Sequence, residues 1–350
     1  MKKIILLVAC VATSLSALAQ STKWSKEKAD KWYSDHKWIS GANFIPSNAI
    51  NQLEMWQEAT FDPQTIDREL GYAESIGFNT MRVFLHSLTY KEDKKGFKQR
   101  MDKYLSIADK HGIQTMFVFF DDCWNATPVI GKQPAPKTGV HNSGWVQDPG
   151  FPESEEKAND KELETYVKDI LTTFGKDKRI LLWDLYNEPG NNGKGMKTMA
   201  LLKNIFKWAR EAAPEQPISA GLWKWDYQEL NTFQVQNSDI ITYHCYGEPA
   251  EHQRIINLLK THDLPMICTE YMARTRNNTF ANTMPLLKKE NIGAINWGLV
   301  NGKTNTIYAW DTPIDSGAEP NVWFHDVFRK DGKPYRKDEG DLIKKLNNEK

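Results

Sequence analysis

Two glutamates, each predicted to end an apolar strand, are the side chains of this sequence best placed for chemistry. Glu188 follows Asn187 at the end of one apolar run and precedes Pro189, which stops a strand, while Glu270 ends a second run. In a parallel α/β barrel the carboxyl ends of the strands collect catalytic groups, so both carboxylates would lie across one rim. A single glutamate at a strand end can equally well face solvent. Whether these two are catalytic therefore depends on the other residues predicted at the same rim.

A pair of carboxylates is what cleavage of a glycosidic bond requires: one protonated acid for the leaving oxygen and one ionised group at the anomeric carbon. Their surroundings must therefore separate their pKa values. Arg82 and the hydroxyl of Tyr246 near Glu270 would favour its ionised, nucleophilic form. Glu188, with less positive charge nearby, would keep a proton, and Asn187 could bind a sugar 2-hydroxyl.

Further polar and aromatic groups are predicted at the same rim. His244 and Tyr246 share one face of a strand because side chains alternate with a period of two. Trp297, at the end of the last strand, could form a flat floor beneath a sugar. A lone Arg82 or His244 is more often a structural partner than a catalyst, but convergence of six such groups favours an active site.

The elements that must position these groups form a βα repeat. Helices separate most of the predicted strands, and over about 250 residues an eightfold repeat is typical of a (β/α)8 TIM barrel of the α/β class. No linker or change of composition divides residues 21–350, which we expect to form a single catalytic domain. The eight predicted strands are centred on Ile39, Thr80, Thr115, Leu181, Ser219, Ile241, Met266 and Ala294.

A long connection at residues 121–155 interrupts this repeat and is rich in Pro, Gly and Asn. Loops of this length are usually functional or disordered. Trp124 and Trp145 within it favour a loop that packs over a site. The alternative is a surface insertion.

Residues 1–20 are predicted to be a signal peptide rather than part of the fold. A lysine pair precedes an apolar stretch at 4–19, and a small-x-small pattern predicts cleavage after Ala19 or Gln20. We therefore expect a secreted or periplasmic protein. A lipoprotein box ending at Cys10 is the less favoured alternative because the apolar run before it is short.

The amino-acid composition limits the classes of binding partner that we expect for this chain. The 45 basic and 45 acidic residues balance, which gives no indication of a nucleic acid or membrane-surface partner. No later segment approaches the roughly 20 apolar residues of a membrane span. The three cysteines that follow the signal form neither a disulfide framework nor a zinc spacing. We expect a monomer that binds carbohydrate and uses no metal or cofactor.

Taken together, the strand-end residues resemble clan A of the retaining glycoside hydrolases, most closely family 5, the cellulase and mannanase group. The resemblance implies a (β/α)8 barrel, Glu188 as acid/base, Glu270 as nucleophile, and hydrolysis of β-linked poly- or oligosaccharide with retention. It rests on Asn187-Glu188-Pro189, Glu270, Arg82, His244-x-Tyr246 and Trp297.

The third strand departs from this family pattern. Many members carry a histidine near its end, whereas this chain has Asp121 and Asp122, which could bind a sugar hydroxyl or cap the loop. The departure leaves substrate and exact family open. Secondary candidates for sugar contacts, for which core packing is an equal alternative, are Asn43, Trp124, Trp223 and Trp225.

Two other functions compete with hydrolysis. One is a catalytically silent sugar-binding barrel, although both glutamates are intact. The other is a metal-dependent barrel enzyme with ligands from His244, Glu188, Glu270 and Asp121, although no His-x-His pair lies at a strand end. The sugar, its linkage and endo or exo action are not predicted.

Overall fold

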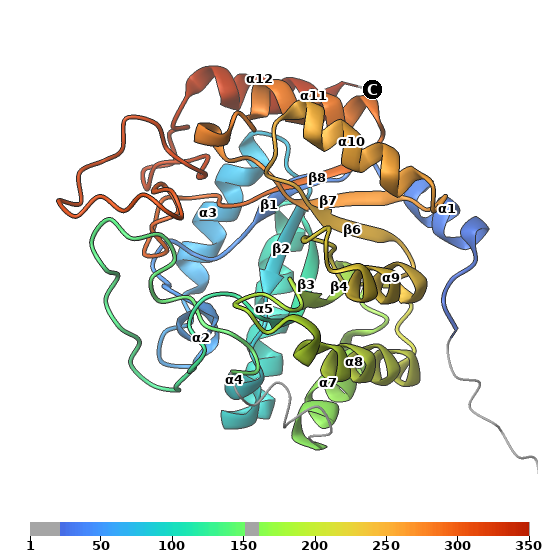
Figure 1. The fold of residues 1–350 in the computed structure, drawn as a ribbon. Coiled ribbons are helices and arrows are strands. Elements are labelled where there is room, and N and C mark those ends of the chain that lie inside the picture. The colour runs from blue at the N-terminus through green and yellow to red at the C-terminus, as the bar shows by residue number, and fades with distance from the viewer. Residues whose placement is uncertain (1–21, 151–160, 350) are drawn as a thin grey trace, which may run out of the picture.

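The computed structural model describes residues 22–150 and 161–349. The predicted signal peptide at 1–20 and the end of the predicted 121–155 connection lie outside this range. The sequence also predicts a helix over 156–174, whose first residues lie outside it too. Eight parallel strands form a barrel surrounded by helices (Figure 1), as predicted. The strands are β1 (Ser40–Asn43), β2 (Thr80–Phe84), β3 (Gln114–Asp121), β4 (Ile180–Asn187), β5 (Ile218–Ser219), β6 (Ile241–His244), β7 (Met266–Glu270) and β8 (Gly293–Asn296).

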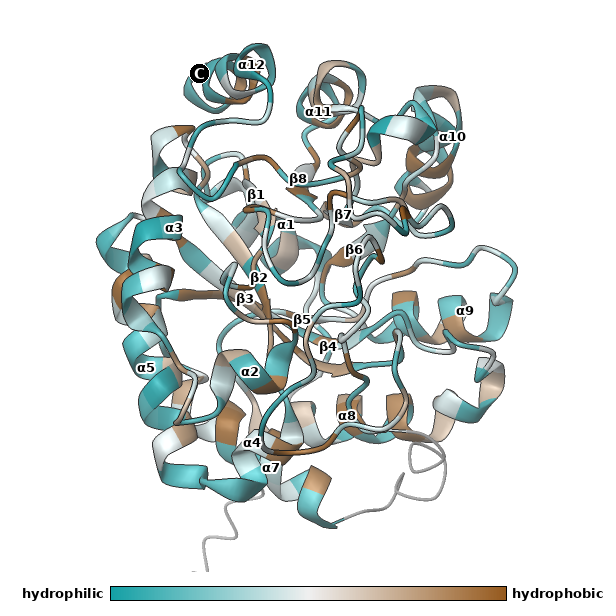
Figure 2. Ribbon diagram, turned by 90° about the vertical axis from the view of Figure 1, so that its left-hand side faces the viewer, coloured by the Kyte–Doolittle hydropathy of each residue, from teal (hydrophilic) through white to brown (hydrophobic). Residues whose placement is uncertain are grey.

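Every strand is followed by at least one helix, and the helices pack their apolar faces against the barrel (Figure 2). No helix in the described ranges is long and apolar enough to cross a membrane. The helices are α1 (Lys26–Ser34), α2 (Gln52–Trp56), α3 (Pro63–Ser75), α4 (Ser87–Glu92), α5 (Lys94–Lys110), α7 (Lys161–Phe174), α8 (Met199–Ala212), α9 (Gln228–Asn237), α10 (Pro249–Lys260), α11 (Phe280–Lys289) and α12 (Lys337–Asn348).

Helix α3 illustrates how local sequence sets the boundaries. The Asp62 side chain caps its first turn by accepting from the amides of Gln64 and Thr65, and Pro63 occupies the first turn, where no donor is lost. Gly77 then ends the helix region at a φ of 79°. The spacing of Ile66, Leu70 and Ala73 predicts a helix over 63–76, and α3 matches this range to within one residue.

The fifth strand differs from its prediction. The sequence predicts a short strand over 217–223, but ladder pairing with β4 covers only Ile218 and Ser219. The barrel closes beyond that point through an isolated parallel bridge between Leu222 and Tyr243. The amide of Leu222 donates to Thr242 at 3.0 Å, so the circle of strands is complete although β5 is short.

Two long segments leave the carboxyl ends of β3 and β8 and lie side by side at the left of Figure 1. In the described part of the first, residues 122–150, Trp145 is 2% exposed but Trp124 is 38% exposed. The predicted packing therefore holds for residues 141–150, whereas most residues between 124 and 139 are exposed or half-buried. The second, residues 297–336, has no sequence periodicity and was not predicted as a separate feature.

Candidate active site

The side chain of Arg82, on β2, lies fully buried at the centre of the barrel mouth. Its Nε donates to Asp184 at 2.9 Å, and its Nη1 donates to Glu270 at 2.8 Å. Nη1 also donates to Asn43 at 2.8 Å, and Nη2 to Asn187 at 2.7 Å. One guanidinium therefore fixes side chains from β1, β4 and β7.

Glu270 ends β7 and is 5% exposed. Its Oε1 accepts from Arg82, while its Oε2 accepts from the Tyr246 hydroxyl at 2.9 Å. Burial raises the pKa of Glu270, and the neighbouring Glu188 charge raises it further, whereas Arg82 and Tyr246 counter the rise. These two partners stabilise the ionised form, as the sequence predicts.

Glu188 follows β4 with a φ of 45°, a left-handed conformation that non-glycine residues rarely adopt and that often marks functional sites. Its Oε2 accepts from the Asn191 amide at 2.5 Å and from the Cys123 thiol at 3.2 Å. Its Oε1 lies 2.9 Å from His244 Nδ1. Burial raises the pKa of Glu188, which favours a protonated carboxyl.

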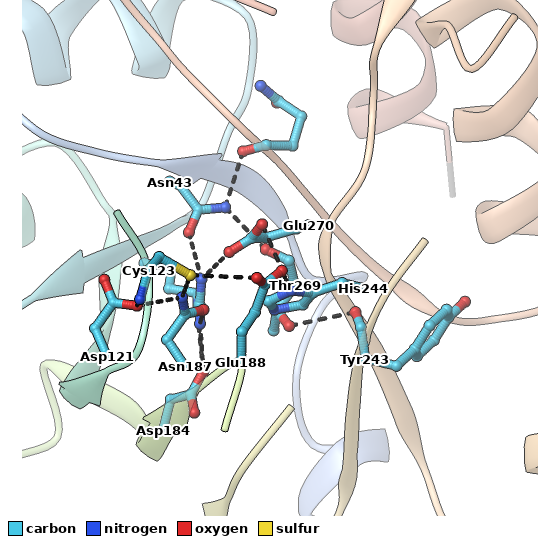
Figure 3. Close-up of polar contacts among 12 residues, drawn as sticks. Asn43, Asp121, Cys123, Asp184, Asn187, Glu188, Tyr243, His244, Thr269 and Glu270 are labelled. Atoms are coloured by element: carbon cyan, nitrogen blue, oxygen red, sulfur yellow. Dashed lines mark hydrogen bonds and ion pairs between the residues drawn. The ribbon is translucent and has the colours of Figure 1, made fainter. Parts of the chain in front are cut away.

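The carboxylates of Glu188 and Glu270 are turned toward each other beside His244 (Figure 3). An oxygen of each and a ring nitrogen of His244 all lie within 4.8 Å of one another. Retaining glycosidases hold their carboxyl groups about 5–5.5 Å apart and inverting enzymes about 6.5–9.5 Å apart. Oxygens that approach within 4.8 Å favour the shorter, retaining spacing.

This trio is also the one grouping within the described ranges that is spaced to hold a metal ion. A cation there would compete with Arg82, which already pairs with Glu270 at 2.8 Å. Burial lowers the pKa of His244 to about 4, so its ring is neutral and serves the two carboxyls as a hydrogen-bonding partner.

The two aspartates that end β3 are used within the protein. Asp121 accepts from Asn187 Nδ2 at 2.9 Å and from Trp145 Nε1 at 2.7 Å, and burial raises its pKa to about 6. Asp122 accepts from Lys194 at 2.6 Å and from the amide of Gly190 at 2.8 Å. Asp121 therefore orients Asn187, and Asp122 fastens the turn that follows β4.

A cavity of about 490 Å³ opens above the two glutamates. Aromatic faces and amide groups dominate its surface, a combination suited to a ligand with apolar faces and hydroxyl edges. Among its lining residues are Trp124, Trp145, Trp223, Trp225, Trp297, Trp310, Tyr246, Asn142, Asn187, Asn191 and Asn192.

The structure divides the predicted site residues into two groups. Those that line the cavity are Glu188, Glu270, Asn187, His244, Tyr246, Trp297, Trp124, Trp223 and Trp225. The others lie outside the lining: Arg82 and Asp121 bond directly to Glu270 and Asn187, and Asn43 accepts from Arg82.

Several lining residues were not predicted. Asn191 lies three positions after Glu188 in the turn that follows β4, a spacing that could have indicated it. Cys123 adjoins the expected aspartates of strand three. His141, Asn142 and Trp310 come from long loops, and no sequence pattern places them at the cavity.

Comparison with known proteins agrees with this geometry. The family model Cellulase (glycosyl hydrolase family 5) matches residues 40–303. No curated protein matches the chain significantly. Similar solved structures include an endo-beta-1,4-mannanase from Thermotoga petrophila, with 13% identity over 90% of this chain and 77% of that chain, and a TM-score of 0.57.

Two other solved structures share the fold. A GH5_18 protein from Streptomyces cattleya in complex with Manb1-4GlcNAc has 11% identity, a TM-score of 0.60, and coverage of 89% of this chain and 80% of its own. A family 5 mannosidase from Rhizomucor miehei has 14% identity, a TM-score of 0.53, and coverage of 89% and 92%.

Replacement of Arg82 tests its role as the central cation. We expect Arg82→Met to lower the free energy of unfolding by roughly 3–5 kcal/mol at neutral pH, because it leaves buried Asp184 and Glu270 unpaired. Without Arg82 their folded-state pKa values rise further, so the stability deficit should grow as pH increases. Urea unfolding across pH measures this.

The matched control is Arg82→Lys, which keeps the charge but loses the planar fork and should cost less. A loss below about 1 kcal/mol for Arg82→Met, as small as that of an exposed ion pair, would contradict the central role.

Proposed function

Because the chain belongs to glycosyl hydrolase family 5, a family of glycoside hydrolases, we propose that it hydrolyses β-linked oligo- or polysaccharide by double displacement, with Glu270 as nucleophile and Glu188 as acid/base. The observation that carries this proposal is the pair of facing carboxylates, with oxygens within 4.8 Å, in different surroundings. Glu270 pairs with a guanidinium, whereas Glu188 has only neutral partners in direct contact.

In the first step, a Glu270 oxygen forms a bond to the anomeric carbon while the bond to the leaving oxygen breaks. Glu188 transfers its proton to that oxygen, so the leaving sugar departs as a neutral alcohol. Arg82 pairs with Glu270 and favours its ionised form before attack. The products of this step are a glycosyl ester on Glu270 and an ionised Glu188.

In the second step, Glu188 removes a proton from water, and the water oxygen attacks the anomeric carbon and displaces Glu270. Asn191 and Cys123 donate to Glu188 Oε2 and stabilise its ionised form during this interval. Ester formation also removes the negative charge of Glu270, which lowers the pKa of Glu188 at the stage when it must be a base.

Substrate positioning follows from the same contacts. Asn187 Oδ1 accepts from Arg82, and one N–H of its amide is used by Asp121. The other N–H points to the Cys123 sulfur at 3.3 Å, a weak acceptor, and is available to a sugar 2-hydroxyl. Trp297 lines the cavity floor, where an apolar sugar face can rest.

The sugar and the site of action complete the proposal. The solved structures named above are titled as mannanase, as mannosidase or with a mannose-containing ligand, which makes manno-configured substrates the first to assay. Residues 1–20 are proposed to direct export, so the enzyme would act outside the cytoplasm, without a lipid at Cys10.

Removal of the nucleophile should abolish turnover. We expect Glu270→Ala to lower kcat by about 10⁴-fold or more, because no covalent intermediate can form. Added azide or formate should partly restore cleavage of an activated aryl β-glycoside by occupying the vacated space. An inverted first-formed anomer from the wild-type enzyme, detected by NMR, would contradict the double displacement.

The rate loss on removal of the acid should depend on the leaving group. Glu188→Gln should slow poor leaving groups by about 10²–10⁴-fold and activated aryl groups much less, because only the former need protonation. Rates across a series of aryl β-glycosides measure this slope. Equal slowing throughout the series would argue against an acid role for Glu188.

The Cys123 thiol should lower the pKa of Glu188. Burial raises the pKa of this thiol, so it stays protonated and donates to Glu188. Cys123→Ala removes a donor that stabilises the carboxylate, so the pKa of Glu188 should rise and the alkaline limb of kcat/KM should move to higher pH. Cys123→Ser, which keeps a donor, is the control and should show a smaller move. A shift of the alkaline limb of kcat/KM to lower pH in Cys123→Ala would contradict this role.

A further inference from the structure

Three segments that follow β8, β1 and β3 are joined into a continuous wall along one arc of the barrel rim. The strands β4 and β7, which carry Glu188 and Glu270, divide the rim into two arcs. One arc contains β5 and β6, and the other contains β8, β1, β2 and β3. The wall is defined as residues 44–57, 122–150 and 297–336.

The segments after β3 and β8 are held together mainly through backbone atoms. The amide of Asn142 donates to Thr304 O at 2.8 Å, and that of Ile314 donates to Gly139 O at 3.1 Å. His141 Nδ1 lies 2.8 Å from Tyr308 O. These contacts lie over the mouth side of the barrel, where the two long loops approach each other in Figure 1.

The segment after β1 fills the remaining gap. Asn51 Nδ2 donates to Gly144 O at 2.8 Å, and Gln52 Nε2 donates to Val146 O at 3.0 Å. The amide of Lys303 donates to Ser47 O at 2.9 Å. All three segments are therefore tied to one another.

The inner face of the wall is Trp145. Its ring packs edge-on against Trp297 at 5.5 Å and against Phe84 at 5.0 Å, and its Nε1 is bound by Asp121. The space behind Trp145 and Trp297 measures about 20 Å³. A space of this size holds about one water molecule, so no sugar fits beyond Trp145.

The proposed roles set which end of the substrate meets this wall. Glu188 follows β4, the boundary between the two arcs, so the aromatic platform decides the direction. Trp297, which follows β8 in the walled arc and lines the cavity, would carry the sugar under attack, and the leaving sugar would lie on the side away from the wall. On the opposite arc, Trp223 and Trp225 follow β5 and line the cavity, so the leaving group extends toward them.

We propose that the enzyme is exo-acting and removes single sugars from the non-reducing end, because the wall leaves room for one sugar on the glycone side. This inference rests on the proposed function, since it uses the proposed catalytic pair and the Trp297 platform to orient the substrate. The open arc accepts leaving groups of any length.

Product analysis with reducing-end-labelled β-1,4-tetraoses of manno, gluco, galacto and xylo configuration tests the proposal. The first products should be an unlabelled monosaccharide and a labelled triose. Blocking the terminal 4-hydroxyl of the preferred tetraose with a bulky acetal should slow hydrolysis by at least about 100-fold, the order of discrimination a closed pocket provides. Labelled mono- or disaccharide as the first product, or unchanged cleavage of the blocked tetraose, would overturn it.

Aryl β-monoglycosides of the same four sugars separate the two proposals. Their hydrolysis together with internal cleavage of tetraoses would overturn exo action and leave the glycosidase intact. If the enzyme hydrolyses neither the monoglycosides nor the tetraoses, both proposals are wrong.

Two variants probe the opposite arcs. Trp145→Ala should open the wall and bring cleavage of the blocked tetraose to within tenfold of the unblocked one, a tenfold ratio corresponding to about 1.4 kcal/mol. Trp225→Ala is the matched control, which should raise KM for tetraoses while the first product stays a monosaccharide. The wild-type product pattern decides the question if Trp145→Ala does not fold.

Discussion

The buried guanidinium of Arg82 is the constraint on which the barrel mouth depends. A charge without access to water is tolerated only when it is paired and hydrogen-bonded, and Arg82 meets both conditions with Asp184 and Glu270. Its remaining donors reach the amide oxygens of Asn43 and Asn187. Because these partners come from separate strands, the ends of β1, β2, β4 and β7 must stay in register for the charge to remain satisfied.

The buried guanidinium of Arg82 also gives the two glutamates different surroundings. Glu270 lies within direct reach of the guanidinium, and Glu188, one residue beyond Asn187, does not contact it. The left-handed backbone at Glu188 turns its side chain toward His244, Asn191 and Cys123. Burial raises the pKa of both side chains, but only Glu270 has a guanidinium in direct contact, and this difference in surroundings is what the proposed acid and nucleophile roles require.

The sequence allows the barrel and the strand-end groups to be predicted because both follow from strong local signals. The apolar runs of β3 and β4 and the Pro-Gly turn after Glu188 are such signals. Asp184 lies within β4 and pairs with Arg82, although no pattern in the sequence links the two. The short β5 was overestimated because the residues after Ser219 remain apolar, yet they bridge to β6 at a single point.

The wall could not be predicted for a different reason. Its segments are joined largely through backbone amides and carbonyls, such as those of Asn142 and Thr304, and such bonds leave no trace in side-chain periodicity. Strands therefore place the reacting groups, and loops decide how much of a substrate reaches them. Trp145 connects the wall to the strands. Asp121, at the end of β3, accepts hydrogen bonds from both the Trp145 indole and the Asn187 amide. One carboxylate therefore holds both the aromatic ring of the wall and the residue that precedes Glu188.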